Sequence, residues 1–380
     1  MNSPPMGSKV EVIQELRGIA SIGVLLWHAS TFLGPYGTGI GGTLFLSAPT
    51  MGVDLFFVIC GFVMVVSSIR PDGRVVAPGA FFARRFARIY PLYFIATLSI
   101  FMVEPSVPIQ TIGRLLRSLV LMPHADGEAP GITAPTLNVG WTIIYEVEFY
   151  LIFGLSLLLG KNYWKGLAGW FAVAMILPAL LASTSIVNPY SAIVGLPANF
   201  QILFNPLNWL FACGIVIALV YRSPFRIENP FAVRVLSLAA IALAITQYAM
   251  QFRVVHGVFG AGLSMVPLVF ILTLGSKTVN LSPNRVLSHL GRISFSLYLL
   301  HPSAIWMYVR GRDALGMDNP WEGWFAVLFV TSLSILMANL SFRFVESGLS
   351  EFLRYRLTNC ARALLQAKES AKISVQLESK

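Results

Sequence analysis

Long apolar runs alternate with short polar connections along most of the chain. A run of about 20 apolar residues is needed to cross the roughly 30 Å of hydrocarbon in a bilayer. Ten runs approach this length, at residues 14–34, 50–69, 86–104, 139–160, 164–183, 202–221, 233–251, 257–275, 293–311 and 322–345. The pattern predicts an all-α, polytopic membrane protein with about ten transmembrane helices.

Basic residues between the runs predict the orientation. If the N-terminus lies in the cytoplasm, 22 of the 27 Lys and Arg residues fall on the cytoplasmic side. Cytoplasmic loops of membrane proteins carry this excess of positive charge. We therefore expect both termini in the cytoplasm, a membrane domain over residues 1–350 and a basic cytoplasmic tail over residues 351–380. The longest outer connection, 105–138, contains an apolar stretch at 111–122 that is too short to span and should lie at the interface or re-enter.

Composition excludes several classes of protein. Hydrophobic residues make up 56% of the chain and charged residues 12%, against about 45–50% and about 25% in soluble domains. A soluble cytosolic enzyme, a disordered chain and a small disulfide scaffold are therefore excluded. The net charge of +10 follows from the basic loops, so no nucleic-acid partner is needed to explain it. The three cysteines show neither a disulfide framework nor metal-ligand spacing, and we expect no metal site.

Ionisable residues inside the first two runs are the first candidates for chemistry, because charge at membrane depth is costly. Arg17 and His28 are 11 residues apart, which places them on one helix face about 16 Å apart. Histidine suits proton transfer near neutral pH, and Asp54 in the next run could orient His28. The structural alternatives are a snorkelling anchor for Arg17, an interhelical hydrogen bond for His28 and a helix N-terminal carboxylate for Asp54. Cys60 lies in apolar surroundings, where a thiol is usually inert packing.

Three arginines open the third run, in the sequence ARRFAR. Arg85 and Arg88 share a helix face, and with Arg84 and Arg17 they would form a basic cluster at the cytoplasmic mouth. Such a cluster suits a phosphate-bearing cosubstrate. Anchoring of the helix at the positive cytoplasmic side is the alternative.

The fourth and ninth runs supply further candidates. Glu146 and Glu148 in WTIIYEVEFY are about 200° apart around a helix, so they cannot form a carboxylate pair on one face. Trp141 suits the outer interface, and Tyr298 and His301 in SFSLYLLHP lie at membrane depth. We take Trp141, Tyr298 and His301 as candidate substrate-binding residues.

Six segments in this order resemble acyltransferase family 3, membrane-bound O-acyltransferases that modify bacterial surface glycans. They are LRGIASIGVLLWH, GVDLFFVICGF, ARRFARIYPLY, GWTIIYEVEFYLIF, ISFSLYLLHP and FRFVESG, spread over residues 14 to about 350. The fourth segment looks most like the branch that includes exopolysaccharide acetyltransferases. The chain departs from the family at Cys60, where Ser is usual, and at Ser347-Gly348, where Pro often follows the last Glu.

The resemblance implies an activity and roles for these residues. His28 would be the essential histidine and Arg17 its motif partner, with Arg85, Arg88 and Glu146 at the other motif positions. We expect a bacterial inner-membrane enzyme that moves an acyl group, acetyl first among the candidates, from acyl-CoA to a hydroxyl of an exported or lipid-linked glycan. His28 would be the general base, with Asp54 or Glu146 holding its tautomer. Arg17, Arg85 and Arg88 would bind the CoA phosphates, and no cofactor would be permanently bound.

Two other classes of function remain open on the residues alone. A secondary transporter or glycan flippase could use the same intramembrane charges as a proton or substrate path. The absence of evident repeats weighs against it. A glycan polymerase or ligase would be expected to carry a large outer loop. His124, His256 and His289 fall in or beside connections and give no specific signal.

Overall fold

The computed structural model describes residues 11–38, 48–70, 72–104, 112–123, 130–131, 135–182, 185–191, 196–279, 284–316 and 323–359. Within these ranges the regular structure is helical, and the only strand-like pairing is an isolated bridge between Ile69 and Val75. The predicted all-α class is confirmed. His124 and residues 360–380 of the expected tail lie outside the described ranges.

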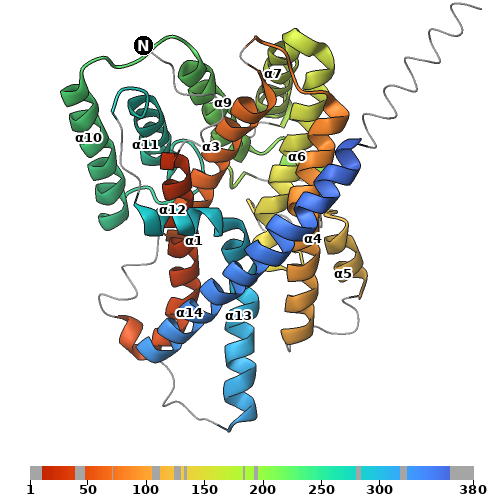
Figure 1. Ribbon diagram of the computed structural model, residues 1–380, viewed down its shortest axis with the longest axis vertical. Helices are drawn as coiled ribbons and strands as arrows, with labels where there is room; N and C mark the ends of the chain where they lie inside the picture. The colour runs from red at the N-terminus through yellow and green to blue at the C-terminus, as the bar shows by residue number, and fades with distance from the viewer. Residues whose placement is uncertain are drawn as a thin grey trace, which may run out of the picture.

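The described chain forms longer helices with shorter helical segments between some of them (Figure 1). The longer ones are α1 (Glu11–Ala29), α3 (Ala48–Ser68), α4 (Pro78–Val103), α6 (Trp141–Ser156), α7 (Tyr163–Ala182), α9 (Trp209–Arg222), α10 (Pro230–Ala249), α11 (Gly262–Gly275), α13 (Ser294–Ala314) and α14 (Trp324–Ser341). The shorter ones are η1 (Ser30–Thr38), α5 (Ile112–Leu119), η3 (Asn138–Gly140), η4 (Leu157–Asn162), α8 (Ala198–Leu203), η5 (Pro206–Asn208), α12 (Arg285–Arg292) and the π-helical η6 (Phe342–Leu349).

Each of the ten predicted apolar runs overlaps one of the longer helices. In the described part of the chain, six stretches are long and apolar enough to cross a membrane. They are 11–34, 49–68, 78–103, 138–178, 230–249 and 324–359. The fourth contains both α6 and α7, while α9 and α11 belong to shorter apolar helices. A multi-pass membrane protein is therefore supported, and the count of ten spans with both termini inside stays a prediction.

Helix boundaries differ from the predicted runs where local chemistry stops the helix. The run at 202–221 becomes helix α9 only from Trp209, because the side chain of Asn205 accepts a hydrogen bond from Leu207 N and Pro206 follows it. The run at 257–275 begins as α11 only at Gly262, because turns occupy residues 250–261. In the stretch at 111–122 the structure forms the short helix α5.

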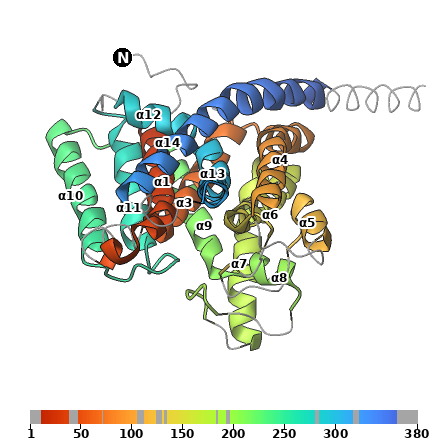
Figure 2. The ribbon, with the colours of Figure 1, turned by 90° about the horizontal axis from the view of Figure 1, so that it is seen from below.

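Helix α3 lies at the centre of the bundle and packs against α1, α9 and α11. It is the most deeply buried of the candidate spans, and α10, at one edge of the molecule in Figures 1 and 2, is the least. Helix α14 crosses the bundle diagonally beside α13. The central place of α3 explains why its sequence is apolar on every side.

Two glycines allow α3 and α9 to approach at backbone distance. A Cβ atom on Gly214 would lie 2.1 Å from the carbonyl oxygen of Val58, and one on Gly61 would lie 2.2 Å from that of Phe211. Small residues of this kind are the usual means of close helix packing in membranes. The crossing fixes α3, which lines the cavity described below.

This crossing gives a stability prediction. Gly214→Ala should lower the free energy of unfolding by about 1–3 kcal/mol, because its methyl group has no space between two backbones. The matched control is Gly169→Ala in α7, where a Cβ atom would meet nothing within 4 Å, and it should change stability by no more than about 1 kcal/mol. Thermal unfolding of the purified variants in detergent measures both. Equal melting temperatures for the two variants would contradict the close crossing.

Candidate functional site

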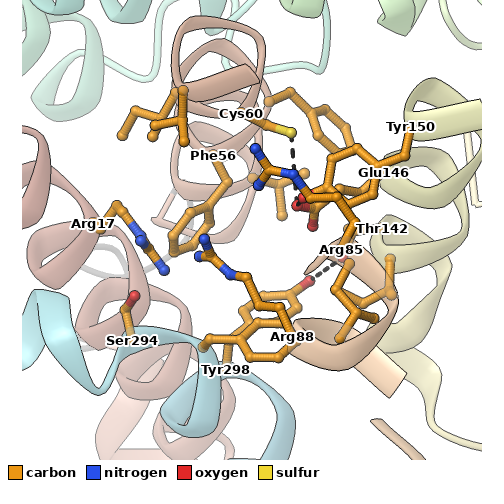
Figure 3. A pocket seen from close by; sticks show the side chains of 17 residues that line it. Arg17, Phe56, Cys60, Arg85, Arg88, Thr142, Glu146, Tyr150, Ser294 and Tyr298 are labelled. Atoms are coloured by element: carbon orange, nitrogen blue, oxygen red, sulfur yellow. Dashed lines mark hydrogen bonds between the residues drawn. The ribbon is translucent and has the colours of Figure 1, made fainter. Parts of the chain in front are cut away.

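A cavity of about 80 Å³ with both charged and apolar lining residues lies between α1, α3, α4, α6 and α13 (Figure 3). Three guanidinium groups line it, from Arg17 on α1 and from Arg85 and Arg88 on α4. The structure therefore brings together in this cavity three of the four arginines that were predicted to form one basic cluster. The other polar or reactive side chains of this arginine cavity are Cys60, Thr142, Glu146, Tyr150, Ser294 and Tyr298.

A wider vestibule of about 430 Å³ adjoins the arginine cavity and shares Arg17, Arg85 and Arg88 with it. Six arginines and two glutamates line the vestibule. They are Arg17, Arg84, Arg85, Arg88, Arg292, Arg354, Glu346 and Glu351. This excess of positive charge favours a ligand with several negative charges, because guanidinium groups bind phosphate oxygens strongly. The vestibule lies at the end of the bundle where α3 ends and α4 begins.

Glu146 is the acidic group that lines the arginine cavity. Its Oε1 accepts hydrogen bonds from the hydroxyl of Tyr150, one helical turn further along α6, and from Cys60 Sγ at 3.6 Å. The guanidinium of Arg85 lies over the ring of Tyr150, 5.0 Å from its centroid, and donates to Ser67 Oγ at 2.7 Å. Glu146 thus supplies negative charge and an acceptor among the arginines, and Tyr150 is a site residue that the sequence analysis missed.

Packed aromatic rings close the end of the arginine cavity that lies away from the vestibule. Phe57 lines the cavity, and its ring lies 4.8 Å from that of Phe211, 6.0 Å from Tyr145 and 6.4 Å from Trp141. Phe149 stacks on the far side of Phe211 at 4.3 Å. Phe57, Phe211 and Tyr145 are almost fully buried. We call the rings of Phe57, Phe149, Phe211 and Tyr145 the aromatic plug.

His28 forms a pair with His301 from α13. Nε2 of His301 lies 3.2 Å from Nδ1 of His28, and the ring centroids are 4.7 Å apart. His28 Nδ1 also lies 3.0 Å from the carbonyl oxygen of Val24, and His301 Nδ1 lies 3.2 Å from that of Leu297. A carbonyl accepts only, so both Nδ1 atoms carry the proton in the neutral rings. His28 Nδ1–H then donates towards His301, and Nε2 of His28 keeps its lone pair.

Tyr298 stands between the histidine pair and the arginine cavity. Its ring lines the cavity beside Phe56 and lies 6.1 Å from the ring of His301, one turn away on α13. Its hydroxyl is held by Thr142 Oγ1 at 3.0 Å and donates to the carbonyl of Val139 at 3.2 Å. Tyr298 therefore touches both halves of the site and separates them.

Asp54 has a different partner from the one the sequence predicted. Its Oδ1 lies 2.7 Å from Nδ1 of His256, and its Oδ2 accepts from Gly257 N at 2.8 Å. The expectation that Asp54 or Glu146 holds the tautomer of His28 is corrected, because His301 occupies that position. No sequence pattern singles out His256, since it lies in a connection 202 residues from Asp54.

Two further candidates on α6, Trp141 and Glu148, do not line the arginine cavity. Trp141 begins α6 and packs against His256, with ring centroids 5.6 Å apart, rather than lining the arginine cavity. Glu148 lies on another face of α6 from Glu146, and its Oε2 is buried without a hydrogen-bond partner among the described residues. Among the residues that the structure describes, no group of three or more His, Cys, Asp or Glu could hold a metal ion.

The contrast between the two glutamates of α6 gives a prediction. Glu146→Gln should lower the free energy of unfolding by about 1.5–3 kcal/mol, because a charged acceptor is lost among buried arginines. Glu148→Gln, two residues away on another face, should leave stability unchanged or raise it, since one oxygen of its carboxylate is buried without a partner in the described part of the chain. Thermal unfolding of the purified variants would measure the difference. If Glu148→Gln were the more destabilising change, the assignment of Glu146 to the arginines would be wrong.

Comparison with known proteins identifies the family. The family described as "Acyltransferase domain" matches residues 13–339. The exopolysaccharide production protein ExoZ of Rhizobium meliloti is 28% identical over 298 residues, which cover 75% of this chain and 85% of that protein. The acyltransferase MdmB of Streptomyces mycarofaciens is 29% identical over 324 residues, covering 78% of this chain and 79% of its own.

A more distant relative points the same way. A Staphylococcus aureus (strain COL) protein named as an O-acetyltransferase is 21% identical over 367 residues, covering 87% of this chain and 56% of that protein. No solved structure matches the chain. The family match spans most of the chain, including the helices that carry the arginine cavity and the histidine pair. The chain therefore belongs to acyltransferase family 3.

Proposed function

We propose that this protein transfers an acyl group, acetyl first among the candidates, from cytoplasmic acyl-CoA to a hydroxyl of an exported or lipid-linked glycan such as an exopolysaccharide. The observation that carries the proposal is the vestibule of six arginines that leads into the arginine cavity. The family supplies acyl transfer, and the name of the relative ExoZ connects it with exopolysaccharide production. The protein would lie in the bacterial inner membrane with ten spans and both termini in the cytoplasm.

The donor would bind through its phosphates. Arg17, Arg85 and Arg88 belong to both the vestibule and the arginine cavity, so they can bind an anion while the attached acyl chain extends inwards. The inner lining of the cavity is largely apolar, with Phe56, Ile59 and Ile143 among its residues. An acyl thioester has this division into a highly charged end and an uncharged end.

His28 would act as the general base. Its Nε2 carries the lone pair, because Nδ1 is committed to Val24 and His301. Nε2 would take the proton of the acceptor hydroxyl as that oxygen attacks the thioester carbonyl carbon. A C–O bond forms, the C–S bond breaks, and the proton passes to the CoA thiolate. The ester and free CoA thiol are the products, and Tyr298 must move for the base and the thioester to meet.

Replacement of His28 tests the catalytic assignment. His28→Ala should lower kcat about 10²- to 10⁴-fold, the usual contribution of a positioned general base. Binding of acyl-CoA should stay close to that of the wild type, because His28 does not line the arginine cavity. The measurement is glycan acetylation in intact cells together with acetyl-CoA binding by the purified protein. Wild-type levels of ester in the mutant would refute the role of His28.

Vesicles of known sidedness separate the enzyme from a transporter or flippase. Inside-out vesicles given labelled acetyl-CoA should transfer label to glycan, whereas right-side-out vesicles should not. Label that remains in CoA in both vesicle types would favour transport.

Arg88→Gln should raise the KM for acetyl-CoA about tenfold through the loss of one charge-assisted contact. Arg74→Gln is the control, since Arg74 is exposed near the same end of the bundle and pairs with Asp72.

A further inference from the structure

A second cluster of polar and aromatic side chains lies beyond the aromatic plug, away from the vestibule. It consists of Asp54 on α3, Trp141 at the start of α6, Tyr190, and His256 with Gly257 in the connection before α11. Asp54 is 13 residues from Ser67, which binds Arg85 at the vestibule, and this separation corresponds to about 20 Å along α3. We call this group the His256 cluster.

The hydrogen bonds of Asp54 determine which nitrogen of His256 is available. Asp54 is fully buried, and its two oxygens accept from His256 Nδ1 at 2.7 Å and from Gly257 N at 2.8 Å. Nδ1 therefore carries a proton, and in the neutral ring Nε2 is an acceptor. Among the described residues no partner occupies Nε2, and the side chain of His256 is 13% exposed. The hydrogen bonds to Asp54 are sufficient to hold the connection of His256 against α3. Nε2 of His256 therefore remains available to a ligand.

Aromatic rings flank the side chain of His256. The ring of Trp141 lies 5.6 Å from that of His256 in an edge-on arrangement, and the ring of Tyr190 lies 6.4 Å away at 33°. Tyr190 is 45% exposed, and its hydroxyl accepts a hydrogen bond from His256 N at 3.1 Å. The rings offer apolar faces beside a hydrogen-bond acceptor. A pyranose has the complementary surface, with hydroxyl groups at its rim and C–H bonds on its face.

The cluster also adjoins the arginine cavity. Val53 and Thr142, the chain neighbours of Asp54 and Trp141, line that cavity, and the ring of Phe57 lies between the cavity and Trp141. A molecule bound at the His256 cluster would therefore lie on the far side of the aromatic plug from the donor.

We propose that the His256 cluster binds a sugar ring of the glycan acceptor. Nε2 of His256 accepts a hydrogen bond from a sugar hydroxyl, and the rings of Tyr190 and Trp141 pack against the sugar. His256 is a positioning residue for the acceptor, and Asp54 positions His256. This assignment rests on the proposed function, because it names where the acceptor of that reaction docks.

The experiment measures the KM for acceptor and donor separately in the full-length protein in detergent. The donor is labelled acetyl-CoA, and the acceptor probe is an oligosaccharide prepared from the surface polysaccharide of the strain that carries this protein. His256→Gln should raise the acceptor KM about tenfold, the loss of one hydrogen bond to the sugar, and leave the KM for acetyl-CoA unchanged. Val255→Ala, at an exposed neighbour in the same connection, should change neither.

Two variants of Tyr190 separate sugar binding from loop anchoring. Tyr190→Phe and Tyr190→Ala both remove the hydroxyl that accepts from His256 N, but only Tyr190→Ala removes the ring. We expect the acceptor KM to rise about tenfold in Tyr190→Ala and less than about threefold in Tyr190→Phe. Equal effects of both, accompanied by equal losses of thermal stability, would show a structural anchor and overturn the proposal.

The remaining outcomes are also decisive. If the wild type transfers label to the oligosaccharide and His256→Gln leaves the acceptor KM unchanged, the His256 cluster is not the acceptor site, and the proposed function stands. If the wild type transfers no label to the oligosaccharide, the proposed function fails and the acceptor site fails with it.

Discussion

The cost of holding charge inside an apolar bundle determines how this protein is arranged. Arg17, Arg85 and Arg88 all lie on helices whose other residues are largely apolar, and a guanidinium at membrane depth is stable only beside water or countercharge. The vestibule gives the guanidinium groups access to water. Glu146 in the cavity and Glu346 at the vestibule wall supply the countercharge. The positions of α1, α4, α6 and η6 follow from this requirement.

The same cost of burying charge keeps the different groups of polar residues in the site apart. A histidine pair can remain neutral, so His28 and His301 can be packed among apolar helices away from the arginines. Asp54 instead pairs with His256, at the end of α3 away from the vestibule. Each of these groups thus has its own partner, and the aromatic rings of Tyr298 and Phe57 lie between them. The reacting molecules would have to approach one another across these rings.

Periodic patterns in the sequence led to correct predictions of the helices and of the basic cluster. Contacts between segments that are far apart in the sequence were not predicted. The apolar runs predicted the helices, and the spacing of Arg85 and Arg88 with the early position of Arg17 predicted one basic cluster, which the structure contains. The link between Tyr150 and Glu146 was also accessible, since they are four residues apart on one helix. The His28–His301 pair joins residues 273 apart and the Asp54–His256 pair residues 202 apart. Helix periodicity carries no information about which helices are neighbours, so these partners could not be deduced.

The aromatic plug has an electrical consequence. A water-accessible vestibule that enters the bundle from one side carries the potential of that side inwards, so most of the transmembrane voltage falls across the remaining apolar layer. Here that layer is the packed rings of Phe57, Phe211 and Tyr145 with their neighbours. A polyanion in the vestibule would cross little of the field, and an uncharged acyl group passing the rings would move no charge through it. The one charge that would move through this layer is the proton that passes from the acceptor hydroxyl to the CoA thiolate, so a membrane potential that is negative on the vestibule side would favour the reaction.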